Sequence, residues 1–256
     1  MTLADTDVDA LAERLDEAER RRRDTVSIAA ATKLSVADAY RVQHTLIRRR
    51  TARGETLVGV KLGFTSRAKM AQMGVSDVIV GHLTDTMRHA DGDAVDLTAF
   101  IHPRIEPEIA FRLAADVDPG DPGTDIESLV DAMAPALEII DSRYQAFRFT
   151  YTDVIADNTS AAAFVLGAWQ PYENPGGRAV RLDTPSAVAT GSTSAVLGDP
   201  RRALHELVTM SRRHDIRLTA GSVILAGAAT EALRFEAGVT RCDIAGLGHL
   251  TVRGVA

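Results

Sequence analysis

The residues Ile105-Glu106-Pro107-Glu108-Ile109-Ala110-Phe111 place two glutamates inside a run whose other members belong in a protein interior. A third glutamate occupies a similar position in Ala136-Leu137-Glu138-Ile139-Ile140-Asp141. Both runs have the length and the apolar character of buried strands. A carboxylate is buried in its ionised form only where a cation or hydrogen-bond donors compensate its charge, so these strands indicate a divalent metal site.

The spacing of the acids within the first run also carries information. Side chains alternate between the two faces of an extended segment, so Glu106 and Glu108 point the same way. Pro107 lacks a backbone donor and fits an edge or a bulge of a sheet. Ligands that are all carboxylate oxygens favour a hard ion such as Mg2+ or Mn2+. The pattern also allows a structural interpretation, in which Glu106 faces solvent and Glu138 pairs with Arg143 or Arg104.

Length and composition bound the class of protein. The chain has 256 residues, of which 45% are hydrophobic, and this suits one large domain or a main domain with a smaller helical appendage. With the metal site indicated above, we expect a single catalytic domain over residues 1–256, in which 1–53 form a helical portion. The formal net charge is -6, and the basic residues are scattered apart from two arginine runs at 20–23 and 48–50. We expect these runs to be solvated helix faces. The sequence therefore predicts no nucleic-acid partner.

Cysteine content and hydropathy bear on the compartment. Cys242 is the single cysteine, which excludes an internal disulfide and a cysteine-based zinc site and suits a reducing environment. The N-terminus carries Asp5 and Asp7 and no basic residue among its first seven positions, and no stretch approaches the roughly 18 to 20 apolar residues that cross a bilayer. We therefore expect a cytoplasmic protein with no membrane partner.

Periodicity predicts two helices followed by a sheet-rich region, which is a mixed α/β (α+β) fold. Apolar positions recur at helical spacing over 8–18 and 36–46, and Ser35 is suited to cap the second segment. Further helical segments are expected at 66–73, 126–133 and 200–213, with a loop at 118–123. Buried or terminal strands are expected at 57–62, 105–113, 136–140, 161–166, 186–196, 222–225 and 249–252.

Lys61 is the candidate proton shuttle. It follows Val58-Gly59-Val60 on an apolar strand, where desolvation can lower the pKa of an ammonium group. Asp85 could orient Lys61 or a water molecule. A lysine that extends from a strand end into water, and an aspartate that caps a loop, are the structural alternatives.

A second set of polar residues could bind an anionic substrate. Arg143 could pair with a carboxylate in bidentate fashion, and Asn158 and Ser160 could hydrogen-bond a bound acid. Gly227 and Thr230 offer a backbone donor and a hydroxyl where the chain can approach an anion closely. Local capping of the backbone explains these residues equally well. The sequence contains no Gly-x-Ser-x-Gly elbow, no Walker loop and no dinucleotide fingerprint.

The ordered set of segments resembles the hydratase/decarboxylase family of meta-cleavage catabolism, which is related to the fumarylacetoacetate hydrolases. The resemblance runs from residue 39 to residue 248. It rests on Lys61-Leu62-Gly63, Thr65-Ser66-Arg67-Ala68-Lys69-Met70, Glu106-Pro107-Glu108, Glu138-Ile139-Ile140-Asp141-Ser142-Arg143 and Ala156-Asp157-Asn158. Within the family, Ile101-His102-Pro103-Arg104 and Ser142-Arg143-Tyr144 with Phe147 and Phe149 look more like 4-oxalocrotonate decarboxylases than like 2-hydroxypenta-2,4-dienoate hydratases.

The resemblance implies a fold, a ligand set and a reaction. The fold is one of N-terminal helices on a curved mixed sheet of fumarylacetoacetase type. The family's metal ligands and lysine transfer by motif to Glu106, Glu108, Glu138 and Lys61. The reaction implied is the Mg2+- or Mn2+-dependent decarboxylation of 2-oxo-3-hexenedioate, a small dicarboxylic 2-oxo acid, to 2-hydroxypenta-2,4-dienoate. One departure is Gly227-Ala228-Ala229-Thr230, where the family has a Gly-Gly-x-Thr pattern.

Two other functions stay open at this level. A hydratase would add water to the 2-hydroxypenta-2,4-dienoate, and a silent subunit would act as a scaffold for a pathway partner. Decarboxylases of the family are associated with complexes with the pathway hydratase, so such a complex and self-association as a homo-oligomer are both expected.

Overall fold

The computed structural model describes residues 2–67, 70–71, 74–75, 77–121 and 123–256. The helices are α1 (Asp5–Arg21), α2 (Val36–Ala52), α4 (Tyr151–Ala156) and α5 (Pro200–His214). The strands are β1 (Leu57–Gly63), β2 (Ile79–Thr84), β3 (Arg88–Ala90), β4 (Ala94–Asp96), β5 (Arg104–Leu113), β6 (Val130–Ile140), β7 (Ala161–Leu166), β8 (Gln170–Pro171), β9 (Ala179–Asp183), β10 (Val188–Ser192), β11 (Val223–Leu225), β12 (Leu233–Arg234), β13 (Gly238–Ile244) and β14 (Gly248–Val255). The mixed α+β fold predicted from the sequence is confirmed.

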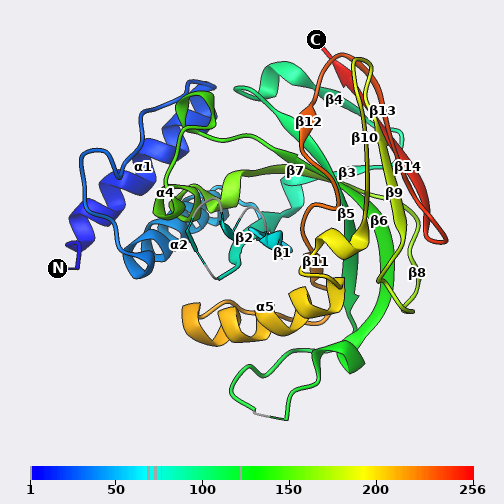
Figure 1. The fold of residues 1–256 in the computed structure, drawn as a ribbon. Coiled ribbons are helices and arrows are strands. Elements are labelled where there is room, and N and C mark those ends of the chain that lie inside the picture. Colours follow the sequence, from blue (N-terminus) through cyan, green and yellow to red (C-terminus); the bar gives the residue numbers. More distant parts are fainter. Residues whose placement is uncertain (1, 68–69, 72–73, 76, 122) are drawn as a thin grey trace.

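Two sheets form the body of the molecule. The larger has nine strands, seven of them in the order β2-β1-β11-β5-β6-β7-β3, with β12 beside β5 and β8 beside β6. The smaller has the order β10-β9-β13-β14-β4. Most pairs are antiparallel, whereas β1/β11, β3/β7 and β4/β14 are parallel. Figure 1 shows the long strands β5 and β6 curving through the centre, with α1, α2 and α4 on one side and the five-stranded sheet on the other.

The N-terminal helices follow from their sequence pattern. The apolar face of α1 buries Val8, Ala12 and Leu15. Ser35 caps α2, where its hydroxyl accepts a hydrogen bond from the backbone N–H of Asp38 at 3.1 Å, as predicted. None of the described helices is long and apolar enough to cross a bilayer.

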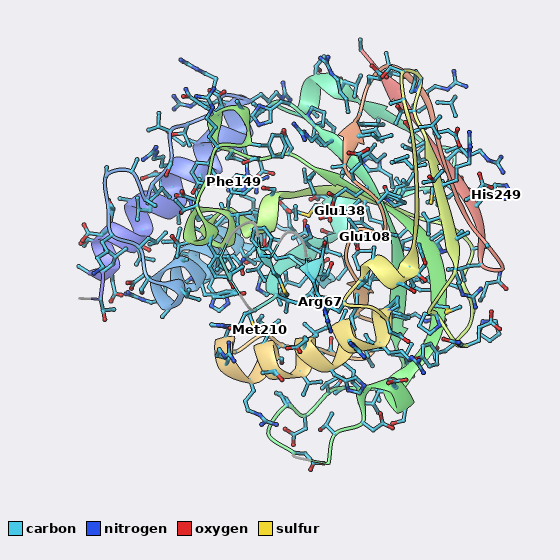
Figure 2. The ribbon with its side chains drawn as sticks, in the orientation of Figure 1. Arg67, Glu108, Glu138, Phe149, Met210 and His249 are labelled. Atoms are coloured by element: carbon cyan, nitrogen blue, oxygen red, sulfur yellow. The ribbon has the colours of Figure 1, made fainter. Side chains whose placement is uncertain are left out.

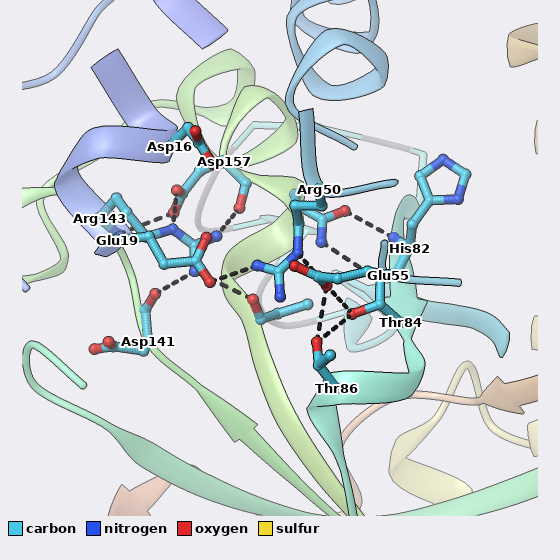
Figure 3. Close-up of polar contacts among 12 residues, drawn as sticks. Asp16, Glu19, Arg50, Glu55, His82, Thr84, Thr86, Asp141, Arg143 and Asp157 are labelled. Carbon is cyan, nitrogen blue, oxygen red and sulfur yellow. Dashed lines mark hydrogen bonds and ion pairs between the residues drawn. The ribbon is translucent and has the colours of Figure 1, made fainter. Parts of the chain in front are cut away.

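A buried ion network fastens these helices to the sheet. Arg50 at the end of α2 pairs with Glu19 of α1 and, at 2.9 Å, with Glu55. Glu55 in turn accepts hydrogen bonds from the hydroxyls of Thr84 and Thr86 at 2.7 and 2.8 Å (Figure 3). The prediction that the arginine run 48–50 is a solvated face is therefore wrong for Arg50, which is buried. Its charge-assisted bonds to the two glutamates compensate the guanidinium there.

The other departures from the predicted elements have local causes. The helix expected at 126–133 is a single 3-10 turn, Ile126–Leu129, because the chain enters β6 at Val130. The strand expected at 186–196 ends at Ser192 and continues as a 3-10 turn. The helix expected at 66–73 and the loop expected at 118–123 lie partly outside the described residues.

Candidate metal centre

The register between β5 and β6 gathers the three glutamates on one face of the sheet. Glu106 lies directly opposite Glu138, and Glu108 follows Glu106 by two residues on β5. A carboxylate oxygen from each of the three lies within 4.8 Å of the other two. Figure 2 shows Glu108 and Glu138 close together in the interior of the molecule. The alternative in which Glu106 faces solvent is wrong, since only 6% of its surface is exposed.

Pro107 fits between the acids because β5 has an opening along one edge. The neighbours on that edge are β11, which pairs with residues 110–112, and β12, which pairs with residues 104–105. The chain at 226–229 crosses the gap, where the N–H of Ala229 donates to the carbonyl of Pro107 at 2.9 Å. The nitrogen of a strand residue points to the same edge as its carbonyl, so the missing donor costs β5 no ladder bond. Pro107 was expected at an edge or a bulge of a sheet. It lies on the central strand β5, at a point where neither β11 nor β12 pairs with that strand.

The electrostatics of the cluster call for a cation. Burial, reinforced by the charge of Glu138, raises the pKa of Glu108 well above its usual range. Burial likewise raises the pKa of Glu138. Among the described residues, no hydrogen bond reaches Oε1 of Glu108 or Oε1 of Glu138, although both atoms are buried. Buried acceptors without donors, in a set of carboxylates only, fit a hard divalent ion.

Lys61 closes the cluster from β1. Its Nζ lies 2.7 Å from Oε2 of Glu138 and donates to the carbonyl of Thr159 at 3.2 Å. Burial by itself would lower the pKa of Lys61, but the charges of the three glutamates outweigh that effect and raise it. The expected lowering is therefore wrong, and the ammonium form is favoured. Lys61 is 3% exposed, so it does not extend into water, and it takes the place of the arginines considered as partners of Glu138.

A strained turn brings the Thr159 carbonyl to Lys61. Asn158, Thr159 and Ser160 all have positive φ, at 48°, 56° and 57°. Such conformations are costly for residues with side chains and persist where the surroundings hold them. Here the Asn158 amide accepts from the N–H of His82 at 2.7 Å and donates to its carbonyl at 2.9 Å. Asn158 thus positions the turn, and it does not line the cavity at the cluster.

A cavity of about 310 Å³ opens beside Lys61 and Glu106. Two of the predicted substrate-binding residues, Ser160 and Thr230, line it. Most of its wall is apolar. The other lining residues are Leu62, Gly63, Phe64, Thr65, Ser66, Ile79, Ile140, Phe147, Phe149, Val154, Thr159, Ala195, Ala228 and Glu231. Sequence reasoning missed the contributions of Phe64, Thr159 and Glu231, which the fold brings together from distant segments.

Gly227 contacts the cluster rather than the cavity. Its N–H donates to Oε2 of Glu108 at 2.7 Å. The φ of Gly227 is 112°, and a Cβ atom there would lie 2.0 Å from the hydroxyl of Thr65. Glycine is therefore required at this position, where the backbone holds a carboxylate of the protein instead of an anionic ligand.

Arg143 does not face the cavity, which corrects its predicted role in substrate binding. It is 1% exposed, and its guanidinium binds the side chain and the carbonyl of Asp157 (Figure 3). It also donates to the carbonyls of Asp141 at 2.8 Å and Ala161 at 3.1 Å. With its donors satisfied in this way, Arg143 holds the segment between β6 and β7 together.

Asp85 is likewise not brought to Lys61. Its side chain is exposed and accepts hydrogen bonds from the N–H groups of Thr56 at 3.0 Å and Thr86 at 2.9 Å. These bonds lower the pKa of Asp85. Lys61 pairs with Gly81 in the middle of β2, whereas Asp85 lies beyond the end of that strand. The predicted orienting role is therefore withdrawn.

Comparison with known proteins finds decarboxylases and hydratases that are similar to this chain over most of its length. No family model matches the chain. It is 43% identical over 248 residues to a 4-oxalocrotonate decarboxylase from Pseudomonas sp, covering 95% of this chain and 96% of that protein. It is 34% identical over 225 residues to a 2-keto-4-pentenoate hydratase from Paraburkholderia xenovorans (strain LB400), covering 85% and 83%. Among solved structures it is similar to 4-oxalocrotonate decarboxylase from Pseudomonas putida G7, complexed with magnesium and adipate, with a TM-score of 0.94, 35% identity and 99% coverage of both chains.

Proposed function

The chain belongs to the hydratase/decarboxylase family, which is related to the fumarylacetoacetate hydrolases, and from this membership we propose that it decarboxylates 2-oxo-3-hexenedioate (4-oxalocrotonate). The products are carbon dioxide and 2-hydroxypenta-2,4-dienoate. The observation that carries this proposal is the 43% identity to a 4-oxalocrotonate decarboxylase over nearly the whole of both chains. The buried glutamate cluster and the cavity beside it form a site in this chain at which such a reaction could take place.

The cofactor in this proposal is Mg2+, with Mn2+ as the second choice. Glu106, Glu108 and Glu138 would hold it, because they offer buried carboxylate oxygens within 4.8 Å of one another. The relative from Pseudomonas putida G7 is complexed with magnesium. When bound, the ion supplies Lewis-acid stabilisation of the negative charge that develops on the 2-oxygen of the substrate.

The substrate is a vinylogous β-keto acid, so the electron pair of the bond that breaks can be delocalised through its conjugated system to the 2-oxygen. As carbon dioxide leaves, the C5–C6 bond pair becomes the C4–C5 double bond, the C3–C4 double bond moves to C2–C3, and the 2-oxygen gains the charge. Lys61 is the proton donor to that oxygen, since it lines the cavity and its Nζ lies beside the glutamate cluster, 2.7 Å from Glu138. The neutral amine is then reprotonated from solvent.

The walls of the cavity assist by excluding water. Phe64, Phe149 and Val154 line it with apolar surface. A dry wall strengthens the interaction of Lys61 with the developing charge and suits the release of an apolar gas molecule. Ser160 and Thr230 add hydroxyl groups that can hold the substrate.

The hydratase is the second candidate, favoured by the 34% identity to a 2-keto-4-pentenoate hydratase. In that case water would add to 2-hydroxypenta-2,4-dienoate at the same site. Two parallel incubations distinguish the reactions. The decarboxylase releases one carbon dioxide per 2-oxo-3-hexenedioate consumed and leaves the dienoate intact. Consumption of the dienoate without gas release from the dicarboxylate would assign the hydratase instead.

Assembly and location are part of the same proposal. We propose a single catalytic domain with a helical portion at residues 1–53, which self-associates and can bind the pathway hydratase in the cytoplasm. Isolated wild-type chain is expected to be active, and an inactive isolated chain would favour the scaffold subunit. Light scattering of the chain, alone and mixed with the hydratase, measures both associations.

A further inference from the structure

A second cavity adjoins the one at the metal centre. Its lining includes His102, Arg104, Arg234 and Glu236, and Phe147 lines both cavities. Other residues that line the first cavity are also direct neighbours of residues that line the second. Ile140 of the first cavity pairs across β5 and β6 with Arg104 of the second, and Glu231 of the first precedes Ala232 of the second. Phe147 is therefore a wall between the glutamate cluster and a more open hollow.

Two arginines in this second cavity form no ion pair with any residue that the structure describes. Arg104 of β5 and Arg234 of β12 lie directly opposite each other in the strand register, and both are exposed. Like charges in directly opposite positions destabilise a strand pair unless an anion lies between them. Within the described part of the chain, neither arginine forms an ion pair, although Glu236 lines the same cavity. His102 points its Nε2 at the carbonyl of Ser142, 2.7 Å away.

The strand geometry sets the spacing of the Arg104 and Glu106 backbones. Arg104 and Glu106 lie on the same face of β5, two residues apart, which is about 6.7 Å along a strand. An extended six-carbon chain covers a similar length. The guanidinium carbon of Arg104 lies 4.7 Å from the centre of the Phe147 ring. Ala146 and Phe147 both have positive φ, at 51° and 57°, so a strained turn holds the ring at this border.

We propose that Arg104 recognises the distal carboxylate of a dicarboxylic 2-oxo acid whose other end lies at the glutamate cluster. This inference rests on the proposed function and adds to it the residue that selects dicarboxylic over monocarboxylic acids. Arg104 holds the C6 carboxylate before reaction, and keeps its own protons throughout. The C5–C6 bond pair stays with the dienolate, so the departing carbon dioxide is neutral and the contact ends when the bond breaks. Arg104 thus contributes to binding of the substrate more than to the chemical step.

The first test measures binding alone, with the Mg2+-loaded protein in a calorimeter. The probes are adipate (hexanedioate) and hexanoate, which differ only in the distal carboxylate. We expect Arg104→Gln to weaken adipate binding about 10- to 100-fold, which is the range for loss of a hydrogen bond to a charged group, and to leave hexanoate binding unchanged. Arg148 is also exposed and follows the turn that carries Phe147, but it lines neither cavity. Arg148→Gln removes an equal charge and should change neither affinity.

The second test uses steady-state kinetics on 2-oxo-3-hexenedioate. Arg104→Gln should raise KM about 10- to 100-fold and leave kcat within a few-fold of wild type, because the lost contact belongs to the bound substrate. An unchanged ratio of adipate to hexanoate affinity in Arg104→Gln would overturn the inference, as would wild-type protein that binds both acids equally. Wild-type protein that prefers adipate through Arg104 but releases no carbon dioxide would leave this inference standing and reject the proposed reaction.

Discussion

Lys61 is an ammonium group enclosed with three carboxylates, and its proposed task is to move a proton rather than to hold the metal. Lys61→Ala should therefore lower kcat by about 10²- to 10⁴-fold, the usual contribution of a positioned acid or base. The Mg2+ affinity should change far less, since the carboxylate ligands remain. Lys61→Arg is the matched variant, because it keeps the charge but holds its proton too tightly to shuttle it. Turnover and Mg2+ titrations of both variants test this role, and wild-type turnover in Lys61→Ala would exclude it.

Glu108 lies within a group of like charges that is costly without a cation. Glu108→Gln removes one buried charge and can still accept the bond from Gly227, so the metal-free variant should unfold at a higher temperature than metal-free wild type. Adding Mg2+ at 100 times its dissociation constant should stabilise wild type by about 2.7 kcal/mol and stabilise the variant much less. Thermal unfolding with and without Mg2+ measures both effects. Equal stabilisation of the two proteins by Mg2+ would show that Glu108 is not a ligand.

The buried cluster of three glutamates could be predicted from the sequence, because burying an ionised carboxylate in an apolar strand is unfavourable unless a cation or donors compensate its charge. The roles of Arg143 and Asp85 could not. Arg143 is satisfied by Asp157, and Asp85 by two backbone N–H groups, through contacts that no local pattern reveals. A charged residue near an apolar run looks the same in a sequence whether it faces a ligand or another part of the chain.

The backbone that supports Glu108 depends on the segment after β11. Gly227→Ala should destabilise the protein in two ways, through a φ of 112° and through overlap with Thr65. Gly54 has a comparable φ of 99°, but a Cβ atom added there would have no heavy atom within 4 Å, so Gly54→Ala is the control for backbone strain alone, about 1 to 3 kcal/mol. Denaturant unfolding should show the larger loss for Gly227→Ala, together with weakened Mg2+ binding. Equal losses and equal Mg2+ affinity in the two variants would contradict this account.

Elements whose residues are apolar on both faces were predicted well. The expected strand at 161–166 coincides with β7, and those at 57–62 and 105–113 differ from β1 and β5 by one residue each. Strands β9 and β13 were not predicted, since their exposed and buried residues alternate in short runs that include several charges. The 126–133 segment was predicted as a helix because its apolar residues suit both helix and strand. The strand forms from Val130 onward because residues 130–133 pair with β5 and β8.

The arrangement of the two sheets and the N-terminal helices around the site depends on contacts along the whole chain. Sequence periodicity predicted the helices and several strands, but the curved sheet was implied only by the family resemblance. The reason is that strand order depends on pairs far apart in sequence, such as β1 with β11. The site draws on the same long-range order, since Lys61, Glu138 and Thr159 meet from three separate strands and turns.

The buried His82 makes the stability of the whole molecule depend on pH. Burial, with a smaller effect of His44, lowers the pKa of His82 from 6.5 to about 4. The unfolded chain therefore binds a proton below pH 6.5 that the folded chain refuses until about pH 4, so stability falls as the pH drops through this window. His82 alone should lower the free energy of unfolding by about 2 kcal/mol as the pH falls from 7 to 5. Urea unfolding at both pH values should show this loss in wild type and a smaller one in His82→Leu, and identical losses would contradict the assignment.

The central claim is that the three glutamates hold one hard cation on which decarboxylation depends. The most direct measurement follows carbon dioxide release from 2-oxo-3-hexenedioate by protein stripped with a chelator and then titrated with Mg2+. The account predicts that gas release stops on stripping and returns to its full rate as one Mg2+ binds per chain. Undiminished gas release from the stripped protein, or no release at any Mg2+ concentration, would contradict it.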